Sequence, residues 1–243
     1  MLMSEWSLAQ WRRAREILRW RGPLVLTLLA AREILRPAVY WHVFYIFETD
    51  MKNEPLPEPY SKEKVELRLY TRDRDADRAK AEVSAMGELR MGEIEKRLNR
   101  GDAVAIAYVS GEPTGYGWLS VSSGAVELAF GITWVLEPDE GVRYGNFVLP
   151  KWRGRRIHSS VHAAVKAYAR QLGLARTFAS ISTLNTQSMS LAEHYRRTST
   201  MKVTLVHIRG LNWTIHRASG APFESRFTRT ANMEKRWGVL TRD

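Results

Sequence analysis

The chain has 243 residues and no cysteine, which excludes disulfide bonds and cysteine nucleophiles and suits a reducing cytoplasm. Its net charge of +11 favours anionic partners: a nucleotide cofactor, an acidic protein, an anionic lipid or a nucleic acid. A hydrophobic fraction of 44% allows a sizeable core, and the length suits one core domain with an extension.

Residues 1–52 predict a helical extension rich in arginine and tryptophan. Gly22-Pro23 separates a first helix from an apolar segment at residues 24–35. That apolar run is shorter than the roughly 18–20 residues that cross a bilayer. Two interpretations of residues 1–47 stay open: peripheral contact with an anionic membrane or an acidic partner, or packing on the rest of the chain or on a second subunit.

The remainder divides by composition into a linker, a domain and a tail. An aromatic run at residues 38–47 is typical of a strand, and the prolines of residues 53–61 predict a linker. Residues 62–217 predict the main domain, and residues 218–243 a loose basic tail.

Hydrophobic periodicity orders the elements of the main domain. Strands are predicted at residues 65–70, 103–109, 116–121, 126–136, 142–149 and 175–182, helices at 75–98, 157–172 and 189–197, and a closing hairpin at 202–211 and 213–217. This order favours an α+β layered sandwich, with one mixed, mostly antiparallel sheet and helices on both faces. A doubly wound nucleotide-binding fold would alternate strands and helices throughout, and this chain does not.

The most informative stretch joins the strand at residues 142–149 to the helix that follows. Apolar residues from Ile157 to Leu172 recur at steps of three and four, and Gly173 ends the helix. The turn before the helix carries four basic residues, Lys151, Arg153, Arg155 and Arg156. Because a helix start offers unpaired N–H donors and the positive end of a dipole, we expect this turn to bind an anion.

The pattern Val148-x-Pro150-x-x-Arg153-Gly154-Arg155-Arg156-Ile157 resembles the acyl-CoA-binding motif of the GCN5-related N-acetyltransferases. That family usually has Val-x-Pro-x-x-Arg-Gly-x-Gly-Ile-Gly, so Arg156 and His158 stand where it has glycine. Glycine lets a backbone approach a phosphate closely. The resemblance therefore implies either that these two side chains point away from the turn or that the donor lies differently.

The resemblance implies an N-acyltransferase that moves an acetyl or longer acyl group from a CoA thioester directly to an amine. It assigns the pantetheine contacts to the backbone of Asn146, Phe147 and Val148. It assigns the pyrophosphate contacts to the turn made of Arg153, Gly154, Arg155, Arg156, Ile157 and His158. Asn185 and Ser188 match the beginning of the family's later motif and complete the implied cofactor site.

Acyl transfer needs a neutral amine, a polarised carbonyl and an acid for the leaving thiolate. The family commonly uses a tyrosine as that acid, which the resemblance assigns to Tyr195. Tyr195 lies further from Asn185 than the family spacing, so a catalytic and a structural tyrosine both stay open, with His194 as a weaker substitute. Glu127 and Glu137 are the candidate general bases.

Acetyl-CoA or another acyl-CoA is the expected donor, and a small-molecule or peptide amine the expected acceptor. An acyl-phosphopantetheine on an acidic acyl carrier protein is the alternative donor, since it presents no CoA pyrophosphate to the altered turn. A non-catalytic binding module is the other alternative, and the oligomeric state stays open. His158 and His162 have metal-binding spacing without a third ligand nearby, so no metal is predicted. The basic–aromatic stretches are short, which argues against nucleic acid.

Overall fold

The computed structural model describes residues 23, 24, 26–28, 30, 31, 34, 35, 38–55, 61–121, 125–129, 132–185, 188, 189, 192, 199–208, 213–219, 227 and 228. The chain divides into two compact units, one of residues 1–46, 181–224 and 231–243, and a second of residues 47–180 and 225–230. Strands β1 (Val39–Asp50) and β8 (Arg176–Ser182) contribute residues to both units.

The second unit is built on four antiparallel strands that pair in the order β2 (Val65–Tyr70), β3 (Ala103–Val109), β4 (Glu112–Ser120) and β7 (Glu140–Val148). Strand β8 then pairs with β7 in parallel. A mixed, mostly antiparallel sheet is therefore confirmed, with strand ends that differ from the predicted ones by a few residues.

The prediction of one strand at residues 126–136 is wrong. The chain forms a hairpin of β5 (Ala125–Ala129) and β6 (Ile132–Val135), which joins β11 (Phe227–Thr228) in a separate three-stranded antiparallel sheet. The prediction of a single sheet is therefore wrong, and β11 lies within the residues predicted as a loose basic tail. Alternation of apolar and polar residues does not mark a break within a strand-like run; Gly131 was the sequence signal for it.

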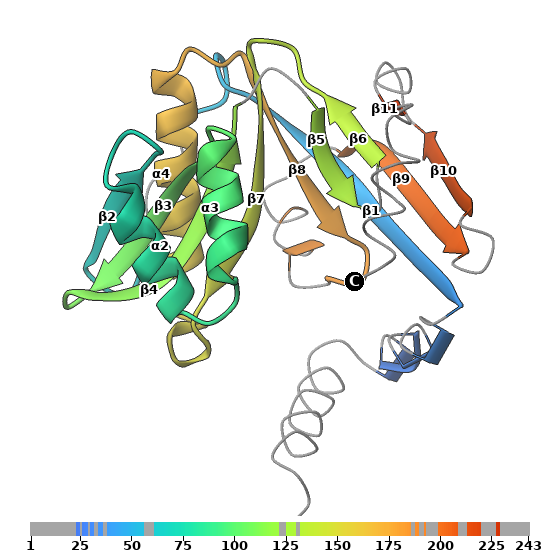
Figure 1. The fold of residues 1–243 in the computed structure, drawn as a ribbon, viewed down its shortest axis with the longest axis horizontal. Coiled ribbons are helices and arrows are strands. Elements are labelled where there is room, and N and C mark those ends of the chain that lie inside the picture. Colours follow the sequence, from blue (N-terminus) through green and yellow to red (C-terminus); the bar gives the residue numbers. More distant parts are fainter. Residues whose placement is uncertain are drawn as a thin grey trace, which may run out of the picture. The chain divides into compact units, whose positions relative to one another are not determined.

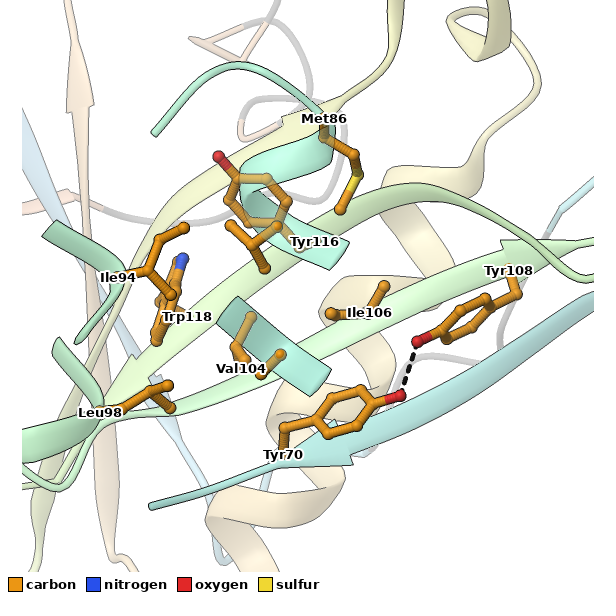
Figure 2. Close-up of a cluster of buried hydrophobic side chains, with 11 residues drawn as sticks. Tyr70, Met86, Ile94, Leu98, Val104, Ile106, Tyr108, Tyr116 and Trp118 are labelled. Atoms are coloured by element: carbon orange, nitrogen blue, oxygen red, sulfur yellow. Dashed lines mark hydrogen bonds between the residues drawn. The ribbon is translucent and has the colours of Figure 1, made fainter. Parts of the chain in front are cut away.

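Helices cover both faces of the larger sheet in this unit (Figure 1). On one face lie α2 (Ala76–Ala85) and α3 (Met91–Asn99), which the sequence pattern predicts as one stretch of one or two pieces. Gly87, at φ 79°, ends the first piece in the left-handed conformation that favours glycine. The core of this face is a cluster of buried side chains (Figure 2): Tyr70, Ala79, Val83, Met86, Ile94, Leu98, Val104, Ile106, Tyr108, Tyr116 and Trp118.

Helix α4 (Ile157–Gln171) lies on the opposite face (Figure 1). Its buried residues, which include Val161 and Val165, pack on Ala105 and Ala107 of β3. Because alternate residues of β3 enter opposite cores, the whole strand is buried, which explains its continuous apolar sequence.

In the first unit, β9 (Ser199–Ile208) and β10 (Trp213–Ser219) form the predicted antiparallel hairpin. Strand β9 begins earlier than predicted, at Ser199. The described residues between 23 and 35 are helical, as predicted for this segment, and the rest of the extension lies outside the described residues. Among the residues that the structure describes, no helix has the length and apolar character to cross a membrane.

Replacing Ile106, whose side chain is fully buried between the sheet and its helices, should lower the free energy of unfolding. We expect Ile106→Ala to cost about 2–5 kcal/mol through lost burial and the cavity left behind. The matched control, Met91→Ala at a residue that is 46% exposed, should stay within about 0.5 kcal/mol of wild type. Urea unfolding measures both, and equal values for the two variants would contradict this core.

Candidate functional site

The pairing of β7 with β8 ends before β7 does. The last register pair is Arg143↔Ala179, yet β7 continues to Val148. Beyond Arg143, the strand partners of β7 within the described residues all lie on β4, as in the pair Phe147↔Tyr116. This segment of β7 therefore has one edge whose backbone groups can pair with an extended ligand.

A bulge interrupts β7 beside this open edge. The register with β4 shifts between Tyr116 and Trp118, so that Gly145 and Asn146 together stand opposite Gly117. Gly145 has φ 58°, in the left-handed region where a Cβ is costly. Gly145 and Asn146 are both exposed, so the bulge turns accessible backbone toward solvent.

Strand β7 leads through the short 3₁₀ turn η1 (Pro150–Trp152) to the start of α4. Helix α4 has no side-chain cap and no acidic residue in its first turn. A Cβ on Gly154 would meet nothing within 4 Å, so the turn is open there. The first-turn amides of a 15-residue helix thus remain without a competing carboxylate, which suits an anion.

Arg156 occupies the N-cap position of α4 with φ 62° and ψ 22°, the left-handed conformation that glycine adopts most readily. The turn therefore keeps a glycine-like backbone although the glycine is absent. This conformation costs a residue with a Cβ roughly 1–2 kcal/mol. Backbone strain of this kind is common in ligand-binding segments, and it marks this turn as a candidate functional site.

Two further arginine side chains of the turn are engaged elsewhere. Arg153 Nε donates a hydrogen bond of 3.2 Å to the carbonyl oxygen of Val148. Arg155 forms an ion pair with Glu63, and its guanidinium carbon lies 4.8 Å from the centre of the Trp152 ring. Since a guanidinium has no hydrogen-bond acceptor, neither side chain can pair with the amides of the helix start. Arg153 does compete for a carbonyl group that a ligand on β7 would use.

His158 and His162 lie one turn apart on α4 and stack, with ring centroids 6.0 Å apart. His162 Nε2 contacts the guanidinium of Arg143, which also donates a hydrogen bond of 2.8 Å to Thr49 Oγ1. Because a guanidinium only donates, His162 Nε2 is the acceptor in this contact. Within the part of the chain that the structure describes, no third metal-ligating side chain joins the two histidines.

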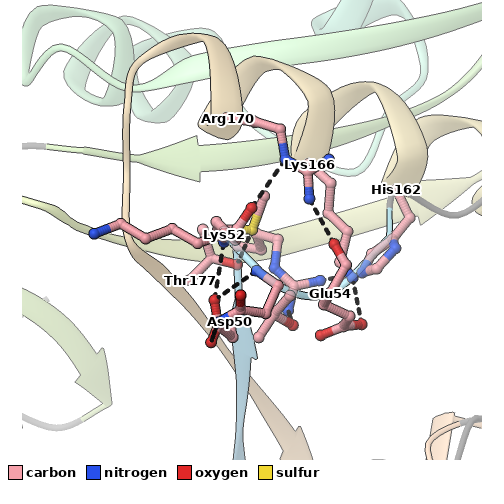
Figure 3. Close-up of polar contacts among 11 residues, drawn as sticks. Asp50, Lys52, Glu54, His162, Lys166, Arg170 and Thr177 are labelled. Carbon is pink, nitrogen blue, oxygen red and sulfur yellow. Dashed lines mark hydrogen bonds and ion pairs between the residues drawn. The ribbon is translucent and has the colours of Figure 1, made fainter.

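The same face of α4 continues with two cations that hold the segment after β1 (Figure 3). Lys166 is 2% exposed, and its Nζ lies 2.8 Å from Glu54 Oε1. Arg170 donates to the carbonyl oxygens of Met51 and Glu54. Hydrogen bonds from Asn53, first its side chain and then its amide, lower the pKa of Asp50. These contacts fix the orientation of α4 and so of the turn at its start.

On the opposite face of the sheet, the structure gathers a polar cluster that sequence reasoning missed. Asp102 is fully buried and accepts hydrogen bonds from the guanidinium of Arg100 and the hydroxyl of Tyr144. Burial, followed by the charge of Asp102, raises the pKa of Tyr144 well above its ordinary value. Tyr144 therefore stays protonated and acts as a donor to the carboxylate.

Arg97 of α3 stands beside this cluster, against the bulge. Its guanidinium carbon lies 4.9 Å from the centre of the Tyr144 ring and 5.3 Å from that of Trp118. Its Nε donates to Glu93 at 3.1 Å. Its Nη1 is buried, has no hydrogen-bond partner among the described residues, and would lie 2.8 Å from a Cβ added to Gly145. The arginine thus brings a positive charge directly to the bulge of β7.

The two candidate general bases lie on different elements. Glu137 is exposed in the turn before β7, and its amide donates to Glu140 Oε2 at 3.1 Å. From Glu140 to Gly145 the strand covers on the order of 15 Å, so Glu137, in the turn before Glu140, lies at the other end of the strand. Glu127 belongs to β5 of the three-stranded sheet, opposite Thr133.

The later motif falls in the first unit. The side-chain oxygen of Asn185 accepts a hydrogen bond of 3.2 Å from the amide of Ser188, and the carbonyl oxygen of Asn185 accepts one from the amide of Met189. Asn185 therefore begins a helical turn, as a capping asparagine does. Tyr195 and His194 lie outside the described residues.

The antiparallel strands, the parallel β7–β8 pair and the helices on both faces form an α+β layered fold with a mixed sheet, and the prediction of that fold class is confirmed. No protein-family model matches the chain, and no curated protein is similar to it.

Solved structures that are similar to the chain include a GCN5-related N-acetyltransferase from Sphaerobacter thermophilus, with 13% identity and a TM-score of 0.49 over 79% of this chain and 57% of that one. A GCN5-related N-acetyltransferase from Kribbella flavida has 10% identity and a TM-score of 0.47, over 82% and 66% of the two chains. The aminoglycoside N-acetyltransferase AAC(6')-Iy, solved with a bisubstrate analogue of CoA, has 19% identity and a TM-score of 0.41, over 54% and 88%. The chain spans less than two thirds of the length of the first two proteins.

Arg156→Gly should stabilise the protein, because it removes the left-handed penalty at the start of α4. We expect the free energy of unfolding to rise by about 0.5–1 kcal/mol, after the greater freedom of glycine in the unfolded chain is subtracted. The matched control is Arg155→Gly, at a neighbour that lacks a positive φ and pairs with Glu63, and it should destabilise by a similar amount. Denaturant unfolding compares the two; a loss of stability in both variants would contradict strain at Arg156.

Proposed function

We propose that the chain is an N-acyltransferase that moves an acyl group from a CoA thioester directly to an amine. The observation that carries the proposal is the continuity between the open edge of β7 and the uncapped start of α4. One backbone path offers strand-type hydrogen bonds to an extended amide-bearing arm and helix amides to phosphates. These are the two binding requirements of acyl-CoA.

In the proposed complex, the backbone of Asn146, Phe147 and Val148 pairs with the pantetheine amides. The pyrophosphate is bound by the turn from Arg153 to His158. The left-handed backbone at Arg156 supports close approach of the phosphates in place of the missing glycine. Arg153 leaves the carbonyl oxygen of Val148 and turns its guanidinium to the phosphate, which matches planar, bidentate donors to an oxyanion.

Acyl-CoA, when bound, supplies the acyl group activated as a thioester. Backbone amides beside the bulge at Gly145 polarise its carbonyl oxygen. Tyr195 is proposed as the acid that gives a proton to the leaving sulfur. Glu127 is proposed as the base that takes a proton from the amine; the position of Glu137 in the turn before β7 argues against it in that role.

An acyl carrier protein is the alternative donor, favoured by the charge of +11. The loss of glycine from the turn also favoured the carrier, because a carrier presents no CoA pyrophosphate to that turn. Since Arg156 retains a glycine-like backbone, the turn can still accommodate a pyrophosphate, and free acyl-CoA is the preferred donor. Saturable binding of an acyl carrier protein, with no heat on titration of CoA, would instead identify the carrier as donor. Binding of either donor without any transfer would point to a non-catalytic module.

A carboxylate placed in the first turn of α4 should weaken CoA binding. Ser159→Asp puts a fixed negative charge in the first turn of α4, where the pyrophosphate is proposed to lie. We expect the dissociation constant for CoA to rise at least about tenfold in isothermal titration calorimetry. The neutral isostere Ser159→Asn should bind like wild type. Equal affinity in all three proteins, or no binding by wild type, would contradict the proposed phosphate site.

Tyr195→Phe tests the proposed acid. We expect the turnover number for acyl transfer to fall about 10²-fold or more, because the thiolate loses its proton donor. CoA affinity should not change, since the hydroxyl alone is removed. Tyr168→Phe, on the later part of α4, is the control and should transfer at the wild-type rate. An unchanged rate in Tyr195→Phe would assign Tyr195 a structural role.

A further inference from the structure

We propose that the acceptor amine of this transferase carries an anionic group, a carboxylate or a phosphate, which Arg97 binds beside the bulge of β7. This inference rests on the proposed acyltransferase function and names the substrate class of the same site.

The proposed donor and acceptor would approach from opposite faces of the sheet. The turn proposed for the phosphates leads into α4, which packs on one face. Arg97 belongs to α3, whose buried residues pack on the opposite face. In a direct transfer, the donor and the acceptor must meet at the reacting carbonyl without overlapping. A donor that reaches the bulge from the side of α4 leaves the side of α3 to the acceptor.

The Arg97 side chain is only 14% exposed, and it is fixed by the Tyr144 and Trp118 rings and by Glu93. Its Nη1 has no hydrogen-bond partner in the described part of the chain. A buried donor without a partner is costly. A carboxylate or phosphate on the acceptor would satisfy it once the guanidinium turns toward the bulge, and would match the planar fork of the guanidinium.

The position of the Arg97 guanidinium depends on glycine at residue 145. A Cβ on Gly145 would lie 2.8 Å from Arg97 Nη1 and 3.1 Å from Trp118 Cδ1. A side chain at this position would therefore displace the guanidinium. With glycine here, and with Gly145 exposed, the guanidinium lies next to backbone that an incoming molecule can reach.

The charge of Arg97 is compensated less completely than that of Arg100. Arg100, the next cation on this face, is paired with the fully buried Asp102. Glu93 is the acid that pairs with Arg97, and it is 46% exposed, so solvent weakens its compensation. A polycationic acceptor would meet repulsion here. A nearby guanidinium also favours the neutral form of an attacking amine, which is the reactive form.

The test compares acyl transfer from acetyl-CoA to matched acceptors that differ in one charged group: an α-amino acid, its α-carboxamide, an amine with a phosphate monoester and a polyamine. Wild type should favour an anionic acceptor over the carboxamide by about 10–100-fold in kcat/KM. The carboxylate and phosphate arms identify which anion is used. Arg97→Met should abolish the preference, mainly through KM, while Arg97→Lys should restore part of it. Lys96→Met, which removes an exposed charge from the same helix, should leave it intact.

Equal rates with the amino acid, the phosphate-bearing amine and the carboxamide, or a preference for the polyamine, would overturn the inference while the transferase function stands. The same holds if Arg97→Met, folded as judged by its thermal unfolding, keeps the wild-type preference. If CoA binds but no acceptor of the panel is acylated, calorimetry with the anionic amines decides; no binding by wild type would overturn this inference alone. Absence of CoA binding would remove the proposed function and the inference with it.

Discussion

The proposed binding edge exists because two parallel strands stop pairing before both of them end. Strands β7 and β8 share a register from Glu140 to Arg143, and within the described residues β7 then pairs on one edge only. A strand anchored on one side is rigid, yet its other edge offers unpaired backbone groups to an incoming chain. The bulge at Gly145 adds accessible backbone at the same place. Binding through this edge relies on backbone geometry, so side chains around it are free to vary.

The position of α4 relative to that edge is held by buried polar contacts as well as by apolar packing. Arg143 is the last residue of β7 that pairs with β8, and its guanidinium joins His162 of α4 to Thr49 of β1. Further along the helix, Lys166 is paired with Glu54 while almost fully buried. Removing one partner of such a pair leaves a charge without compensation, which costs more than the pair itself contributes. These contacts specify one arrangement of α4 and so one position for the turn at its start.

How much was predictable follows from the range of each signal. The turn and α4 were predictable because the motif, the helical periodicity and Gly173 are all local in sequence. The hairpin of β5 and β6 was not, since alternation alone hides a break in a strand. The sequence also did not predict the cluster of Arg97, Tyr144 and Asp102. Tyr144 lies on β7 and Asp102 directly precedes β3, so the two residues are far apart in sequence. An arginine on an amphipathic helix usually indicates a solvent-exposed charge. Only the packed structure shows that the Arg97 side chain lies against two aromatic rings and is 14% exposed.

Amide hydrogen exchange with and without CoA tests most directly whether one ligand occupies both the strand edge and the helix start. The account predicts slower exchange in the presence of CoA at residues 145–148 and 154–159 together, with little change across β2 and β3. Protection confined to other parts of the chain, or the same exchange in both samples at saturating CoA, would contradict it.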